Sequence, residues 1–150
     1  MWLTTRGRYA ARAMIDLACH SKGRPVSLQP ISERQNISLY YLGQLFMNLR
    51  KAGLVKGMRG PSGGYVLTRR PADISIMDIF SAVEEGIYPV NCIRENIDTN
   101  KICDRQDGCV TRLVWKKLYE QTSKLLATTT LKDACKELDN LKKKKTKTLR

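Results

Sequence analysis

The feature that most restricts the possible folds is an apolar stripe followed at once by a glycine-rich hairpin pattern. Between Ser38 and about Lys51, four apolar residues recur at i, i+3, i+4 and i+7, which is the spacing of a helix that buries one face; they are Leu42, Leu45, Phe46 and Leu49. Gly53 ends this helix, and residues 54–59 and 64–68 have the pattern of two short strands joined by a tight turn. The sequence therefore predicts a mainly α fold with a small β wing.

Two further helical segments precede this unit. Residues 9–18 carry apolar side chains at alternating steps of one and three, which indicates a helix with one buried face that ends before Pro25. A shorter helix is expected over residues 27–35, with a turn at residues 36–37 and Ser38 as the next N-cap. Two helices joined by a short turn and followed by a hairpin predict a winged helix-turn-helix.

The outward face of the third helix carries side chains that suit a groove of double-stranded DNA. Gln44 can pair with an adenine edge, and Tyr40 and Tyr41 can contact phosphate or a thymine methyl group. In the hairpin, glycines allow a close backbone approach to a narrow minor groove, whose negative potential attracts the guanidinium of Arg59. Solvated helix positions and an ordinary surface hairpin are the alternatives.

The charge distribution favours a polyanionic partner. Residues 1–70 carry 12 basic and 2 acidic side chains, within a chain whose formal net charge is +13. Nucleic acid is the usual partner when such charge lies on a folded segment, and a solvated basic surface is the alternative. Because no apolar run could span a bilayer and the first residues lack the apolar core of a signal peptide, we expect a cytoplasmic protein with no membrane partner. An enzyme is not expected, since no nucleophile with a base, paired carboxylates or phosphate loop is recognisable.

Five cysteines form the second chemical feature of the chain. Cys92, Cys103 and Cys109 follow one another at steps of 11 and 6 residues, which is too wide for a thioredoxin-type pair or a zinc knuckle but compatible with one loop around a metal centre. An odd number of cysteines without export signals favours reduced thiols over a disulfide framework. Cys19 and Cys135 lie in helical patterns, where we expect small buried side chains rather than ligands.

The C-terminal part is predicted to be helical and to end in a basic tail. The stripe of Val114, Leu118 and Leu125, flanked by Trp115, Tyr119 and Leu126, predicts a helix too apolar to be fully solvated. A partner subunit or the chain's own domain should cover this stripe. A further short helix is expected after Thr130, with four residues facing inward: Leu131, Ala134, Leu138 and Leu141. The lysine-rich residues 142–150 are expected to form a disordered tail with non-specific attraction to DNA.

Most of the chain resembles one family of regulators. The continuous run from Ile31 to Tyr65 is similar to the IscR-type family of winged-helix iron–sulfur cluster regulators. Parts of residues 78–84 resemble the segment before that family's cluster loop, and Cys109 with Leu113 and Trp115 resembles the start of its dimerisation helix. The resemblance implies a winged helix-turn-helix domain over residues 1–84, a cysteine-containing cluster loop over 85–110, a dimerisation helix and C-terminal helix over 111–141, and the basic tail over 142–150.

The resemblance further implies a homodimeric transcription regulator that binds double-stranded promoter DNA under the influence of an iron–sulfur cluster and controls cluster-assembly or stress genes. The implied ligands are Cys92, Cys103 and Cys109, with a [2Fe–2S] cluster as the expected type. The fourth ligand is unknown, because Arg112 stands where the family has a histidine. DNA contacts are expected from Ser38, Tyr40, Tyr41, Gln44, Arg50, Lys51, Arg59, Gly60, Pro61 and Ser62.

The gap between Cys92 and Cys103 is also wider than is typical of this family, and Gly43 is a third departure, since family members often carry an acidic side chain at that position of the recognition helix. Because glycine inside a helix costs roughly 1 kcal/mol relative to alanine, a close approach of the backbone to DNA or to a partner would explain it. Two other functions stay open. The same cysteines could form a thiol or zinc switch, or the winged helix could be an interaction module that contacts protein, in which case DNA binding would lack a strong salt dependence.

Overall fold

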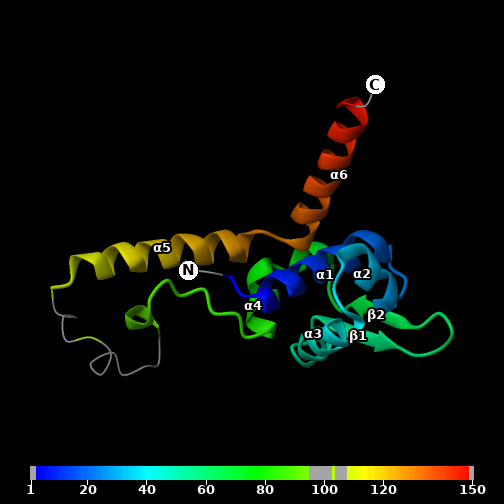
Figure 1. Ribbon diagram of the computed structural model, residues 1–150, viewed down its shortest axis with the longest axis horizontal. Helices are drawn as coiled ribbons and strands as arrows, with labels where there is room; N and C mark the ends of the chain where they lie inside the picture. Colours follow the sequence, from blue (N-terminus) through cyan, green and yellow to red (C-terminus); the bar gives the residue numbers. More distant parts are fainter. Residues whose placement is uncertain (1–2, 95–102, 104–107, 149–150) are drawn as a thin grey trace.

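Helices dominate the structure, and a two-stranded antiparallel sheet is the one sheet in the part of the chain that the structure describes (Figure 1). This structure is a computed structural model that describes residues 3–94, 103 and 108–148. The elements of the N-terminal part are α1 (Thr5–Ser21), α2 (Leu28–Gln35), α3 (Leu39–Lys51), β1 (Val55–Met58), β2 (Gly64–Leu67), the 3₁₀ turn η1 (Pro71–Asp73) and α4 (Ile76–Ala82). A second 3₁₀ turn, η2 (Asn91–Ile93), and two long helices follow: α5 (Val110–Thr128) and α6 (Leu131–Thr148).

The core lies between α1, α3 and α4, and it is made by the stripes predicted from the sequence. The four apolar residues of α3 are buried: Leu42, Leu45, Phe46 and Leu49. Each buried side chain of this size contributes about 1.5–3 kcal/mol through removal of apolar surface from water. Ser38 is the N-cap of α3, as predicted, and its side chain accepts a hydrogen bond from the Tyr41 amide at 3.3 Å. The winged helix-turn-helix fold is thus confirmed in its central helices.

The wing is a hairpin that lies against the chain before α2. Its strands pair from Val55 opposite Leu67 to Met58 opposite Gly64. Tyr65 also exchanges two backbone hydrogen bonds with Val26, at 2.8 and 3.0 Å. Gly64 has a φ of +149° and a Cβ there would lie 2.4 Å from the Val26 carbonyl carbon, so only glycine fits this close approach. The hairpin loop therefore projects from a base that is fixed to the helical domain (Figure 1).

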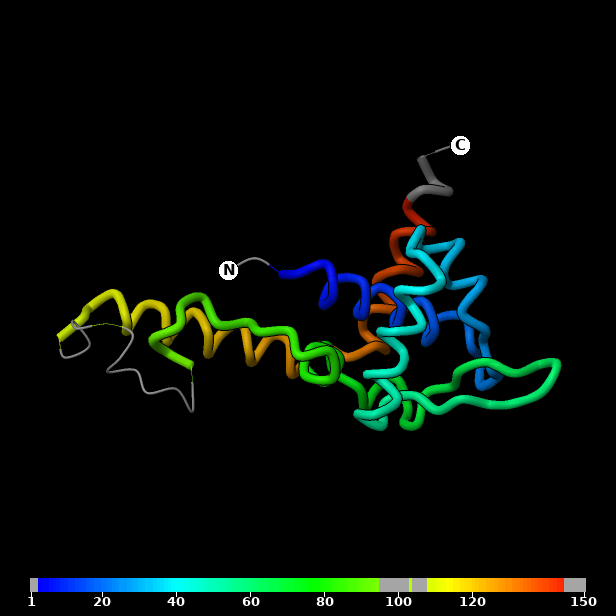
Figure 2. The backbone as a smooth tube through the Cα atoms, turned by 60° about the horizontal axis from the view of Figure 1, so that its bottom comes forward, coloured from blue at the N-terminus to red at the C-terminus, as the bar shows by residue number. Residues whose placement is uncertain are grey.

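An arm formed by α5 extends away from this domain on the side opposite the wing (Figure 1). The chain between α4 and η2 leaves the domain and runs outward beside α5, as both views show (Figures 1 and 2). Tyr88 stacks on Tyr119 of α5 with 4.6 Å between ring centroids, and the Arg94 guanidinium lies 5.7 Å from the Tyr88 ring centroid. These ring contacts fix the segment that carries Cys92 to the arm.

The C-terminal helix differs from the expectation in two respects. Leu131 is fully buried, as predicted, but Leu141 is 58% exposed, because α6 projects from the domain after its first turns (Figure 1). Residues 142–148 belong to α6 and do not form the expected disordered tail. Lysine is a good helix former and is favoured near a helix C-terminus, where it interacts with the helix dipole. Among the described residues, no helix is both long and apolar enough to cross a membrane.

Candidate nucleic-acid interface and cysteine site

The outer face of α3 presents a row of exposed side chains. Tyr40, Gln44, Met47 and Lys51 recur at i, i+4, i+7 and i+11 and all are exposed, with Tyr40 at 78%. Arg50 is also exposed, in the last turn. Because the inner face of the same helix is fully occupied by the core, this outer face is available to a ligand. It combines an amide, a phenol and cations, which can recognise base edges and phosphates.

Two of the candidate residues on α3 have structural partners. Tyr41 is half-buried and its ring meets the ring of Tyr9 edge to face, with 6.0 Å between centroids. The Ser38 side chain is exposed and is used as the N-cap of the helix. Both residues hold the N-terminal end of α3 in place, while Tyr40 beside them is directed to solvent.

The tip of the wing supplies the remaining candidates. Arg59, Gly60, Pro61 and Ser62 are all exposed on the hairpin loop. Gly60 has a φ of +114°, and a Cβ on Gly63 would lie 2.5 Å from the Met58 carbonyl oxygen, so the tight turn depends on glycine at both positions. The hairpin loop is therefore narrow beside Arg59, its first residue. A narrow loop with a guanidinium suits insertion into a narrow minor groove.

Positive charge covers both parts of this surface. Residues 35–72 contain the cations Arg50, Lys51, Lys56, Arg59, Arg69 and Arg70 and no acidic residue. All six are exposed. Arg70 is paired with Asp73 at 2.7 Å, and the other five cations give this region a positive potential that attracts the phosphates of nucleic acid over a distance of about 10 Å at moderate ionic strength.

The three candidate ligand cysteines are free thiols, each half-buried. Cys92 lies in η2, whereas Cys109 is the N-cap of α5; Cys103 lies in the segment between them. Within the described residues, no three side chains among His, Cys, Asp and Glu are grouped closely enough to hold a metal ion. The structure therefore does not bring the three thiols together.

Cys92 opens into a cavity of about 500 Å³ between η2 and α5. Three cations, Arg94, Arg112 and Lys116, and one acidic residue, Glu120, line this cavity together with Tyr119. From the sequence, Arg112 stands out only as the residue in place of a histidine ligand, and the predominantly cationic lining was not predicted. Two features of the sequence could have indicated it: Arg94 lies two residues after Cys92, and Arg112 and Lys116 lie one helical turn apart on the following helix.

The N-terminus of α5 favours the thiolate form of Cys109. A hydrogen bond with the Thr111 hydroxyl, 3.2 Å from the sulfur, lowers the pKa of this thiol, and the Arg112 amide and charge act in the same direction. Thiolates are the form in which cysteines bind metals. Cys109 is thus chemically suited to ligation, whichever group it binds.

Cys19 and Cys135 are not the separate buried thiols that the sequence predicted. They form a disulfide between α1 and α6, with 5.6 Å between their Cα atoms, and both are half-buried. The reason for the difference is that α6 packs beside the last turns of α1, which places the two β-carbons opposite each other. Helical periodicity along the chain does not indicate contacts across 116 residues.

Comparisons with known proteins agree with this architecture. The model of the Rrf2 family, described as iron-dependent transcriptional regulators, matches residues 3–137. The HTH-type transcriptional regulator IscR of Xenorhabdus nematophila is 43% identical over 141 residues, which are 94% of this chain and 83% of that protein. IscR of Serratia proteamaculans has the same identity and coverage.

Two solved structures are similar over nearly the whole chain. CymR, the global cysteine regulator of B. subtilis, has a TM-score of 0.74 at 36% identity and covers 91% of this chain and 98% of its own. IscR of T. potens has a TM-score of 0.71 at 38% identity and covers 92% of this chain and 88% of its own. The named relatives are transcriptional regulators, which agrees with the expectation of a non-enzymatic protein. The match over residues 3–137 and the identity to the IscR proteins show that this chain belongs to the Rrf2 family of transcriptional regulators.

Proposed function

We propose that this chain is a cytoplasmic, homodimeric regulator that binds promoter DNA through α3 and the wing, and that an iron–sulfur cluster on its cysteine segment modulates this binding. The observation that carries the proposal is the exposed row of Tyr40, Gln44 and Lys51 on α3 within a stretch of chain that has six cations and no acidic residue. Such a face suits the major groove, while Arg59 on the projecting hairpin suits the adjacent minor groove.

The exposed stripe on α5 supports a homodimer. Val114, Leu118 and Leu125 are 54%, 40% and 64% exposed, and α5 has no buried residue. Tyr119 and Leu126, on the adjoining face of the helix, pack on the chain's own core. A second copy of α5 would cover the stripe and would place two recognition helices for a two-fold symmetric DNA site.

The cysteine segment has the donor chemistry that an iron–sulfur cluster needs. Cys92, Cys103 and Cys109 are free thiols, Cys109 has a lowered pKa, and cationic side chains surround the cavity at Cys92, which suits an anionic group. A bound cluster supplies a centre that responds to oxidants and to iron supply. Holding the three thiols in one site would fix residues 92–109 against α5 and thereby bias the arrangement of the two winged helices.

DNA binding is tested by fluorescence anisotropy with a family operator sequence at several salt concentrations. Gln44→Ala should weaken specific binding by about 1–3 kcal/mol, and Lys51→Ala should reduce the salt slope by about one. Lys132→Ala removes an exposed cation from the first turn of α6, outside α3 and the wing; this variant is the matched control and should leave both values nearly unchanged. Affinity that is insensitive to salt and to Gln44→Ala would contradict the proposed interface.

Cofactor binding is tested on protein purified without oxygen. Iron, acid-labile sulfide and visible absorption should be present in the parent protein and lost in the Cys103→Ala variant. In a second measurement, the operator affinity of the parent should change when the cluster is removed. A colourless parent after anaerobic reconstitution would contradict the cluster. Zinc content and thiol counts would then distinguish a zinc switch from a thiol switch on the same three cysteines.

A further inference from the structure

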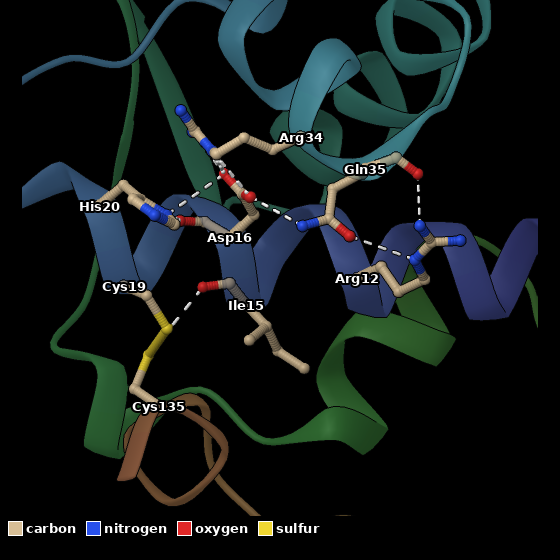
Figure 3. A network of polar contacts seen from close by, with 8 residues as sticks. All are labelled: Arg12, Ile15, Asp16, Cys19, His20, Arg34, Gln35 and Cys135. Carbon is tan, nitrogen blue, oxygen red and sulfur yellow. Dashed lines mark hydrogen bonds and ion pairs between the residues drawn. A yellow bond between two sulfur atoms is a disulfide. The ribbon is translucent and has the colours of Figure 1, made fainter. Parts of the chain in front are cut away.

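A disulfide joins the DNA-binding domain to the C-terminal helix. Cys19 lies in the last turns of α1 and Cys135 in the second turn of α6 (Figure 3). Their Cα atoms are 5.6 Å apart, within the range of about 4.4–6.8 Å that a disulfide requires. We infer that this pair is a reversible redox-modification site, oxidised and reduced by exchange with low-molecular-weight disulfides and thiols, and that its state sets how firmly α6 is held on α1.

The position of the pair makes it reactive rather than inert. Both cysteines are half-buried and neither is enclosed in the core, so the pair lies near the surface, where small thiols and disulfides act. A regulator that binds chromosomal DNA works where small thiols keep most cysteines reduced, and a disulfide there is usually transient. An accessible disulfide in that environment follows the ratio of small disulfide to small thiol.

The exchange is balanced without any other reactant. A thiolate of the reduced pair attacks a disulfide RSSR, which forms a mixed disulfide and releases one RSH. The second thiolate then attacks the protein sulfur of the mixed disulfide, which forms the Cys19–Cys135 bond and releases the second RSH. The two cysteines lose two electrons, RSSR gains them, and the two thiol protons end on the two RSH molecules.

The bond is the second of two anchors for α6. The first anchor is non-covalent: Leu131 is fully buried and its amide donates to the Ile74 carbonyl at 3.0 Å, while the Ile76 amide donates to the Thr129 carbonyl at 2.9 Å. Cys135 lies one turn further along α6 and fixes its direction. After reduction the first anchor remains, and the Cys135 thiol can donate to the Ile15 carbonyl oxygen, which lies 3.9 Å from its sulfur. Both redox states are thus compatible with the fold, but α6 loses its covalent link.

The same turn of α1 holds the helix-turn-helix unit. Asp16, three residues before Cys19, is buried and accepts hydrogen bonds from Arg34 at 2.6 Å and from Gln35 at 2.8 Å, both at the end of α2 (Figure 3). The His20 ring lies 3.5 Å from the same carboxylate. A change in the packing of α6 on the end of α1 therefore occurs within one helical turn of the Asp16 contacts. These contacts position α2 and also α3, which follows α2 after the turn at Asn36.

The first test measures the bond itself in the apo protein, independently of DNA. The protein is equilibrated in buffers of glutathione and glutathione disulfide at stepped ratios, free thiols are trapped with a maleimide, and the labelled peptides are mapped by mass spectrometry. Cys19 and Cys135 should lose and regain labelling together as the ratio changes. Labelling of both at every ratio, pairing with Cys92, Cys103 or Cys109 instead, or a bond that persists in reduced glutathione alone would each overturn the inference.

The second test measures the docking of α6. Trypsin should cut within residues 132–148 several-fold faster in reduced parent protein than in oxidised protein, because the protease needs the helical backbone around the exposed lysines to unfold locally, and loss of the covalent link makes this unfolding easier. The Cys19→Ala/Cys135→Ala variant should be cut at the reduced rate in both buffers. Circular dichroism of the parent should be the same in the two buffers if the domain stays folded. Equal cleavage of oxidised and reduced parent would overturn the link to α6, whatever the outcome of the operator-binding and cluster experiments.

Discussion

The Glu85 carboxylate accepts a hydrogen bond from the backbone amide of Thr4, with 2.8 Å between oxygen and nitrogen, and so ties the start of α1 to the segment after α4. It also accepts from the Thr4 hydroxyl and from the Gly7 amide. Glu85 is only 9% exposed, so these bonds are shielded from water. A carboxylate at a helix N-terminus satisfies unpaired amides and complements the helix dipole. The segment that leads to Cys92 is therefore fixed to the DNA-binding domain at its first residues.

Replacement of this carboxylate should destabilise the protein. Glu85→Gln removes one acceptor oxygen and directs an amide NH₂ at donors, so we expect the free energy of unfolding to fall by about 1–3 kcal/mol in urea titrations. Glu84→Gln is the matched control, because the neighbouring side chain is 88% exposed and is 4.0 Å from its closest cation, Arg6. The same loss in both variants would show that charge alone, and not the buried hydrogen bonds, is responsible.

Two glycines within helices should respond in opposite ways to alanine. A Cβ on Gly7 would lie 2.6 Å from the Cγ of Glu85, so Gly7→Ala should destabilise the fold by about 1–3 kcal/mol. A Cβ on Gly43 meets no described atom within 4 Å, so Gly43→Ala should stabilise α3 by up to about 1 kcal/mol. If DNA approaches the Gly43 backbone closely, this stabilised variant should bind operator more weakly; unchanged affinity would contradict that explanation of Gly43.

The contrast between these residues indicates which parts of the fold the sequence could reveal. The stripe of α3, the Ser38 cap and the glycine-rich wing depend on spacing over a few residues, and all were predictable. The Glu85–Thr4 contact joins residues 81 apart and the Cys19–Cys135 bond joins residues 116 apart, and local periodicity contains no information about such pairs. Tyr41 illustrates the same limit in the site, since only the packing of α1 on α3 shows that its ring meets Tyr9.

Acid should weaken the contact between α1 and α2. Burial by itself would raise the pKa of Asp16, but hydrogen bonds from Arg34 and Gln35 and the charge of Arg34 outweigh burial and lower the pKa below its ordinary value of 3.8. Because the folded-state pKa is below the unfolded-state pKa, this contribution to stability is complete above about pH 5 and is lost as the pH falls through the folded-state value.

Asp16→Asn should therefore lower the stability at pH 7 by about 3 kcal/mol and flatten the decline of stability below pH 4, as measured by urea titrations over that pH range. The control is Asp73→Asn, which breaks the exposed pair with Arg70. Salt screens that pair and its side chains are in water, so little change in the urea midpoint is expected. An acid profile of Asp16→Asn parallel to that of the parent would contradict the assignment.

A charge in the α5 stripe should prevent self-association. Leu118→Glu places a carboxylate where a second copy would bury apolar surface, so sedimentation velocity should show a shift from dimer to monomer at micromolar concentration. Lys124→Glu changes charge on the same helix outside the stripe and should remain dimeric. A monomeric parent, or a dimeric Leu118→Glu variant, would exclude α5 as the dimer interface.

The Cys19–Cys135 bond should make the stability of the apo protein depend on reductant. It closes a loop across 116 residues, and restriction of the unfolded chain by such a loop corresponds to about 5 kcal/mol in the chain-entropy model. Urea titrations should therefore show a lower midpoint for the parent after addition of dithiothreitol. The Cys19→Ala/Cys135→Ala variant should start near the reduced value and show no response, whereas Cys109→Ala, which keeps the pair, should respond like the parent. The buried Leu131 and the backbone hydrogen bonds of Leu131 to Ile74 and of Ile76 to Thr129 remain in every variant. A response confined to proteins with the pair would therefore assign the effect to the covalent link rather than to the packing of α6.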